Sequence, residues 1–213
     1  MTHSQDERHA LCDLLADVGP DQPTLCAGWQ TADLAAHLVL RERRPDAGAG
    51  VMGGPVARYT RRVQARIAAR YSFAELIELI RNGPPRLSMF GFPGADEKLN
   101  LVEYFVHHED VLRARPDWQP RKVDPELVDV LWDRLKLARL MMRKAPVGVE
   151  LARADAGRGR VRITAKARTP VVTVTGDPVE LTLWTMGRTS VARVQLDGAD
   201  SDVAALSSDH WRP

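Results

Sequence analysis

The sequence predicts an α+β protein with an N-terminal helical bundle and a small C-terminal α+β domain. Before Pro146, apolar residues recur at the spacing of amphipathic helices. After it, β-branched residues alternate with polar ones, which is typical of strands. We therefore predict two domains, 1–145 and 146–213. The second is small for independent stability, so we expect it to pack on the bundle.

About six helices are expected in the first domain, and four of them are long enough to form a bundle. Gly19-Pro20 is a stop signal for the first helix, Thr31 suits the N-cap of the second, and Pro116 ends the fifth. The predicted helices cover residues 9–19, 31–44, 56–70, 73–83, 99–115 and 125–144.

The second domain is predicted to contain four strands and two short helices. The first two strands are joined by a turn at 155–160, as in a hairpin. Asp177, Pro178 and Glu180 form the start signal of a helix, and Gly187 ends it. The strands are expected at 147–154, 160–167, 171–175 and 191–198, and the helices at 179–186 and 201–207.

The composition is that of a soluble globular protein, with 44% apolar and 27% charged residues in a chain of 213. A net charge of only +2 gives no general case for nucleic-acid binding. No apolar run approaches the roughly 18 residues that span a membrane. The polar N-terminus does not resemble a signal peptide, and Cys12 and Cys26 are too few for a disulfide framework. We expect a cytoplasmic protein whose two thiols are buried and free.

Three of the six histidines lie near the chain ends, His3 and His9 where the N-terminus is expected to fray and His210 in the C-terminal tail. The other three lie well inside predicted bundle helices, and these are His37, His107 and His108. Glu103 and His107 have i, i+4 spacing, so both side chains leave the same face of one helix. A third ligand from another helix would complete a His2Glu set with an open position, the arrangement of catalytic zinc. His37 shares a helix face with apolar residues and is predicted to supply that ligand.

Asp110 lies on the face of His107 and has two predicted roles. It could accept the second imidazole proton of His107 and fix its tautomer, or act as a general base. His108 is rotated roughly 100° from His107 and is the rival ligand. The alternative without metal treats Glu103 and His107 as a surface pair and His37 as a hydrogen-bonded core residue.

Two segments of the chain resemble the mycothiol-dependent maleylpyruvate isomerase group, within the DinB-like helical bundle superfamily. GWQTADLAAHLVLRE is similar to the first metal helix of that group, and EYFVHHEDVLRARP to its second. VVTVTGDPVELTLWTMGR is similar to the group's second domain, which is related to sterol-carrier-like folds. The matching residues are Trp29, Asp33, His37, Glu103, His107, Asp110, Arg113 and Ala114.

This resemblance implies a DinB-like four-helix bundle that holds one divalent ion, zinc in the first instance, by His37, Glu103 and His107. It further implies a transferase or isomerase that acts on a small electrophilic substrate with mycothiol as the thiol cosubstrate. The chain would be a monomer or homodimer, without nucleic-acid or membrane partners. The sequence departs from the group's pattern at His108, where a Gly is common.

Two other functional hypotheses remain open from the sequence. One is a metal-binding or small-ligand-binding protein of the same fold that catalyses no reaction. The other is an interaction protein that uses a basic helix, because four arginines recur every four residues in the third predicted helix. A solvated helix face is the simpler interpretation of those arginines, which are Arg58, Arg62, Arg66 and Arg70.

Overall fold

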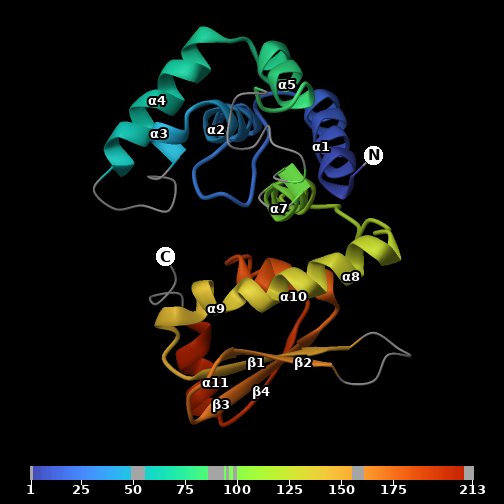
Figure 1. The fold of residues 1–213 in the computed structure, drawn as a ribbon, viewed down its shortest axis with the longest axis vertical. Coiled ribbons are helices and arrows are strands. Elements are labelled where there is room, and N and C mark those ends of the chain that lie inside the picture. The colour runs from blue at the N-terminus through green and yellow to red at the C-terminus, as the bar shows by residue number, and fades with distance from the viewer. Residues whose placement is uncertain are drawn as a thin grey trace. The chain divides into compact units, whose positions relative to one another are not determined.

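The computed structural model describes residues 2–48, 56–85, 94, 96–97, 100–154 and 161–208. The chain divides into two compact units, residues 1–120 and 121–213. The first unit is helical and the second combines helices with a four-stranded sheet, so the predicted α+β class is confirmed (Figure 1). None of the helices in the described part of the chain is long and apolar enough to cross a membrane.

Four helices of unit 1 contribute buried side chains to its main apolar core. α1 packs against α5 and α7, and α2 packs against α4 and α5. The helices are α1 (His3–Val18), α2 (Thr31–Arg43), α3 (Pro45–Gly48), α4 (Ala57–Arg70), α5 (Phe73–Arg81) and α7 (Leu101–Leu112). The buried core includes Leu11, Leu15, Leu34, Leu38, Ile77, Ile80, Tyr104 and Val111.

Helix α1 begins earlier than the apolar pattern predicts. A capping box closes its first turn, because the Thr2 side chain accepts from the Gln5 amide and the Gln5 side chain accepts from the Thr2 amide. His3 and His9 therefore lie within a helix that starts at residue 3 rather than in a frayed terminus.

Unit 2 contains a sheet in the order β2-β1-β3-β4. β1 pairs antiparallel with β2 and parallel with β3, and β3 pairs antiparallel with β4. The predicted hairpin pairing is therefore confirmed, while its turn at 155–160 lies outside the described residues. The strands are β1 (Gly148–Arg153), β2 (Arg162–Lys166), β3 (Val171–Gly176) and β4 (Gln195–Asp197).

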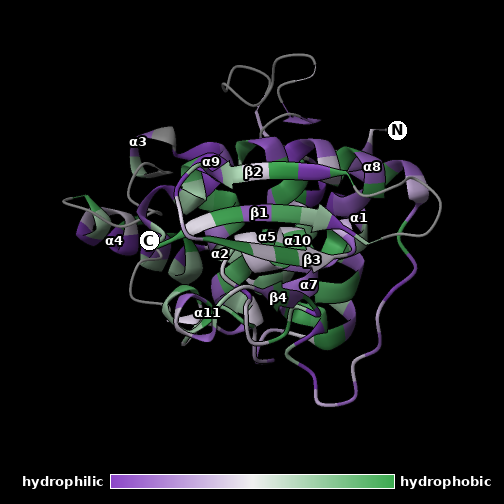
Figure 2. Ribbon diagram, turned by 90° about the horizontal axis from the view of Figure 1, so that it is seen from below, coloured by the Kyte–Doolittle hydropathy of each residue, from purple (hydrophilic) through white to green (hydrophobic). Residues whose placement is uncertain are grey.

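Helices α8 and α10 lie on one face of this sheet (Figures 1 and 2). Asp177 caps α10 through its side chain, and Pro178 occupies the first turn, as predicted. The predicted helix at 125–144 is divided into α8, a 3₁₀ turn at Leu135–Leu137, α9 and a second 3₁₀ turn at Met142–Lys144. The helices of unit 2 are α8 (Pro125–Arg134), α9 (Ala138–Met141), α10 (Pro178–Thr185) and α11 (Asp200–Ser207).

The division between the units falls after Pro120 rather than after residue 145. Trp132, Leu135 and Met142 belong to the same buried cluster as residues of the sheet such as Val149 and Val174. The segment from 125 to 144 therefore serves the core of unit 2. Helical periodicity predicts that such a segment buries one face, but it does not identify the element that covers that face.

Candidate metal centre

Three side chains from two helices of unit 1 converge on one point. His37 comes from α2, and Glu103 and His107 come from α7, where one helical turn separates them. The Nε2 atom of each histidine lies 3.2 Å from the same oxygen, Oε1 of Glu103. All three donor atoms lie within 4.8 Å of one another. The structure thus brings together the three residues that the sequence predicted as a set.

Burial limits the freedom of this cluster. His37 and His107 are 3% and 7% exposed, and the Glu103 side chain keeps 19% of its surface accessible. The rings of His37 and His107 meet edge to face with centroids 5.3 Å apart, and the ring of Trp29 lies 5.0 Å from that of His37. Packed rings hold the two nitrogens in place, while part of the Glu103 side chain remains accessible to solvent.

Asp110 orients the ring of His107 from the opposite side. Its Oδ2 atom lies 2.8 Å from Nδ1 of His107, and the residue is fully buried. An imidazole that donates Nδ1–H to a carboxylate presents its Nε2 atom to whatever lies on the other side, which here is Glu103. This geometry matches the first of the two roles predicted for Asp110.

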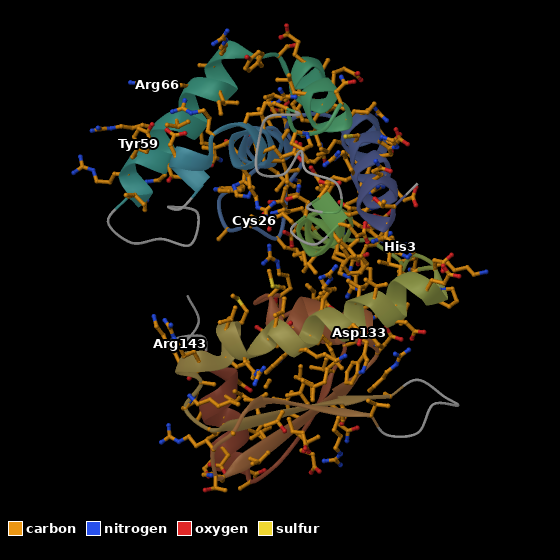
Figure 3. The ribbon with its side chains drawn as sticks, in the orientation of Figure 1. His3, Cys26, Tyr59, Arg66, Asp133 and Arg143 are labelled. Carbon is orange, nitrogen blue, oxygen red and sulfur yellow. The ribbon has the colours of Figure 1, made fainter. Side chains whose placement is uncertain are left out.

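Cys26 is a fourth residue at the cluster, although the sequence predicted only a buried free thiol at this position. It lies on the segment between α1 and α2 (Figure 3), and its Sγ donates to Oδ2 of Asp110 at 3.3 Å. Cys26 is half-buried, and Cys12 is buried as predicted. The Leu25 amide donates to the Asp110 carbonyl at 3.1 Å, which ties this segment to α7. No spacing rule links a residue in a loop to a helix more than 80 positions away.

The protonation of the three residues follows from their burial and their mutual contacts. Burial lowers the pKa of His37 below its usual value. Burial also opposes charge on His107, but contacts with Asp110, Cys26 and Glu103 raise its pKa well above the usual value. Burial alone would raise the pKa of Glu103, yet hydrogen bonds from His107 and His37 hold it well below its usual range. Glu103 is therefore a carboxylate near neutral pH.

His108 faces away from the cluster. Its Nδ1 atom lies 3.8 Å from Oε2 of Glu7 on α1, on a different face of α7 from that of His107. The rotation of roughly 100° per residue separates the two neighbouring histidines, as the sequence predicted. His108 is therefore not part of the group around Glu103.

The donor set fits a zinc ion. Zn²⁺ binds imidazole nitrogens and carboxylate oxygens at about 2.0–2.1 Å, so the donors of a tetrahedral site lie roughly 3.3 Å from one another. The observed separations of 3.2 Å between each Nε2 and the Glu103 oxygen are close to that value. The Asp110 contact also provides the hydrogen bond that a metal-bound imidazole normally makes through its other nitrogen.

Comparison with known families assigns the N-terminal part of the chain. Residues 2–89 match the mycothiol maleylpyruvate isomerase N-terminal domain. The resemblance predicted from the sequence is therefore confirmed over this range. No curated protein and no solved structure matches the chain.

The matched range of the mycothiol maleylpyruvate isomerase domain includes His37 but ends before α7. The roles of Glu103 and His107 therefore rest on their geometry beside His37 and on the resemblance of the second segment.

The four arginines of the predicted basic helix lie on the exposed surface of α4. Thr60 and Val63 are the buried residues of this helix. The helix thus has one inward face and one charged outward face, as the simpler interpretation of a solvated face predicts.

Proposed function

We propose that this chain is a zinc-dependent enzyme that uses mycothiol as a thiol cosubstrate in a transfer or isomerisation reaction. His37, Glu103 and His107 would hold the ion, and Asp110 would orient His107. The observation that carries the proposal is the convergence of two histidine nitrogens on one oxygen of Glu103 at 3.2 Å each. It occurs in a chain whose N-terminal part matches the mycothiol maleylpyruvate isomerase N-terminal domain.

Three protein ligands leave one coordination position for a thiol or water, which is typical of catalytic zinc. Bound zinc lowers the pKa of such a group, so that a strong nucleophile exists near neutral pH. The residues of the chain supply two imidazole nitrogens, a carboxylate and the buried surroundings that this requires, and the ion would displace the proton from Nε2 of His107. Asp110 keeps Nε2 of His107 directed at the shared point because it accepts the proton of Nδ1.

The orienting role of Asp110 is favoured over that of a general base. Its carboxylate contacts Nδ1 of His107, and the convergence point lies on the Nε2 side of the same ring. Asp110 is also fully buried, which separates it from an incoming substrate. It would act through His107 rather than on the thiol directly.

Both reactions need only the thiol and one electrophile, and no oxidant or reductant. In transfer, the thiol loses its proton, a sulfur–carbon bond forms, and the bond between that carbon and its leaving group breaks. In isomerisation, the sulfur adds to an activated double bond, the resulting single bond rotates, and loss of the sulfur restores the double bond and the thiol. The reactive electrophile is thus one with a leaving group or an activated double bond.

The first test measures metal in the protein purified without chelators. We expect about one zinc ion per chain, and loss of that ion in a variant that combines His37→Ala with His107→Ala. His108→Ala is the matched control, since His108 neighbours His107 and is similarly buried at 9% exposure. A wild-type protein without stoichiometric metal would contradict the proposed site, as would a His108→Ala variant that loses the ion.

The second test concerns the reaction itself. Zinc-loaded protein is incubated with mycothiol and an activated aryl halide or an activated alkene, and consumption of each compound is followed. We expect turnover that the double histidine variant lacks. Metal binding without any turnover, and without displacement of a zinc-bound water by millimolar mycothiol, would favour the alternative of a non-enzymatic metal-binding protein.

A further inference from the structure

Asn100 occupies the N-cap position of α7 without capping the helix. Asn is among the preferred N-cap residues because its side-chain oxygen accepts from the first turn of the helix. Here the side chain makes no such bond. Its Nδ2 atom instead donates to Oδ1 of Asp96 at 2.7 Å, and its Oδ1 atom accepts from Nη1 of Arg41. The fully buried Asn100 side chain therefore makes no capping hydrogen bond and instead accepts one from Arg41 on α2.

Arg41 links this residue to the metal centre. It follows His37 by one helical turn on α2, and its Nε atom lies 3.3 Å from Oε1 of Glu103. The same guanidinium therefore contacts Asn100 at the start of α7 and Glu103 one turn later. A planar guanidinium can bridge two acceptors in this way, because its donors have a fixed geometry.

Asp96, the partner of Asn100, is held in turn by two side chains of α1. Oδ1 of Asp96 also accepts from Nη2 of Arg8 at 2.6 Å, and Oδ2 accepts from the Ser4 hydroxyl at 2.9 Å. Arg8 is buried and the Asp96 side chain is 20% exposed, so these contacts are only partly accessible to water. The connected residues run from α1 through Asp96 and Asn100 to Arg41 and the carboxylate of Glu103.

We propose that Arg41 is a positioning residue that holds Glu103 in the geometry of a metal ligand, and that Asn100 fixes Arg41 for this task. The inference rests on the proposed function, since it assigns a role relative to the same ion. Neither residue is distinguished by the sequence alone. In the sequence, Arg41 follows His37 by one helical turn, and Glu103 follows Asn100 by about one turn. These spacings become informative only once the two helices are known to face each other.

Two effects of Arg41 on metal affinity have opposite signs, which makes the inference testable. A positive charge near the site repels the cation, so its removal by itself would tighten metal binding. Loss of an outer hydrogen bond to a ligand typically weakens metal affinity 10–100-fold. If Arg41 positions Glu103, the loss of the hydrogen bond outweighs the loss of repulsion, and removing Arg41 weakens metal binding.

The test compares zinc dissociation constants by chelator competition, together with melting temperatures of the chelator-treated proteins. Arg41→Gln and Arg41→Lys should both bind zinc at least about tenfold more weakly than wild type. The Lys variant keeps the charge but cannot bridge Asn100 and Glu103. Asn100→Ala should weaken binding in the same direction. Arg44→Gln is the control, because Arg44 lies near the end of the same helix and pairs with the exposed Asp46.

Loss of Arg41 leaves Oδ1 of the buried Asn100 without this donor, so both Arg41 variants are expected to melt somewhat below the chelator-treated wild type. Zinc binding is therefore compared well below all the melting temperatures, where every variant is folded, and weaker binding there supports the positioning role. Unchanged or tighter binding in Arg41→Gln, or full recovery in Arg41→Lys, would overturn it while leaving the proposed function intact. A wild-type protein that binds no zinc would instead overturn the proposed function itself.

Discussion

The two cysteines of the chain occupy different environments. Cys12 is fully buried in the core of unit 1, and its thiol donates to the Ile77 carbonyl at 3.7 Å. Cys26 is half-buried beside Asp110. Burial raises the pKa of the Cys12 thiol from 9.0 to about 12. The folded protein therefore holds the Cys12 proton more tightly than the unfolded chain does.

This difference predicts how stability depends on alkaline pH. The contribution of Cys12 is fully present below about pH 9 and is lost as the pH rises toward 12, because only the unfolded chain releases the proton in that range. The unfolding free energy of the wild type should therefore fall above pH 9 more steeply than that of Cys12→Ala, by about 1.4 kcal/mol per pH unit. Denaturant unfolding between pH 8 and 11 measures both slopes, and equal slopes would show that Cys12 is not protected.

The residues of the candidate metal centre differ in how far the sequence could predict them. Glu103 and His107 follow from helical spacing, because residues four apart on one helix must share a face. His37 required the inference that a histidine among apolar residues points inward. Cys26 and Arg41 could not be predicted, since their partners come from other segments and only the packing of those segments brings them together.

Capping residues determine several helix boundaries. At the start of α5, the Ser72 hydroxyl accepts from the Glu75 amide at 3.3 Å, and the Glu75 carboxylate accepts from the Ser72 amide at 2.7 Å. The same signal, Thr2 with Gln5, starts α1 and is visible in the sequence. The apolar pattern of α1 starts later than its cap, so hydrophobic periodicity alone predicts a start of the helix that is too late.

The capping box of α5 predicts a measurable loss. Ser72→Ala removes the hydroxyl that satisfies the Glu75 amide, and the unfolding free energy should fall by about 1 kcal/mol. Ser201→Ala is a suitable control, since Ser201 is an exposed serine in α11. Urea denaturation of the three proteins decides the matter. Equal effects of the two substitutions would mean that the cap contributes nothing specific.

For the whole chain, the sequence predicts the fold class and the presence of two parts, but places their boundary too late. Patterns of hydrophobicity are local, whereas a boundary depends on which distant residues share a core. Trp132, Leu135 and Met142 show the difference, because their spacing is helical and their partners belong to the sheet.

The boundary after Pro120 can be tested with fragments. A fragment of residues 121–213 retains the whole cluster around Trp132 and should fold more stably than residues 146–213, which lack one side of that core. Circular dichroism and thermal melting of the two fragments provide the comparison. Cooperative unfolding of the shorter fragment at the same temperature would contradict the division seen in the structure.

The order of the ligands along the chain has a consequence for the biosynthesis of the protein. His37 and Glu103 are 66 residues apart. At about 5–20 residues per second, a ribosome needs several seconds to extend the chain from one to the other. During that interval, α2 presents a histidine without its partners, so a nascent chain cannot offer the complete ligand set. If the proposed centre holds an ion, its loading would therefore follow the synthesis of α7, which comes after the N-terminal segment that matches the family.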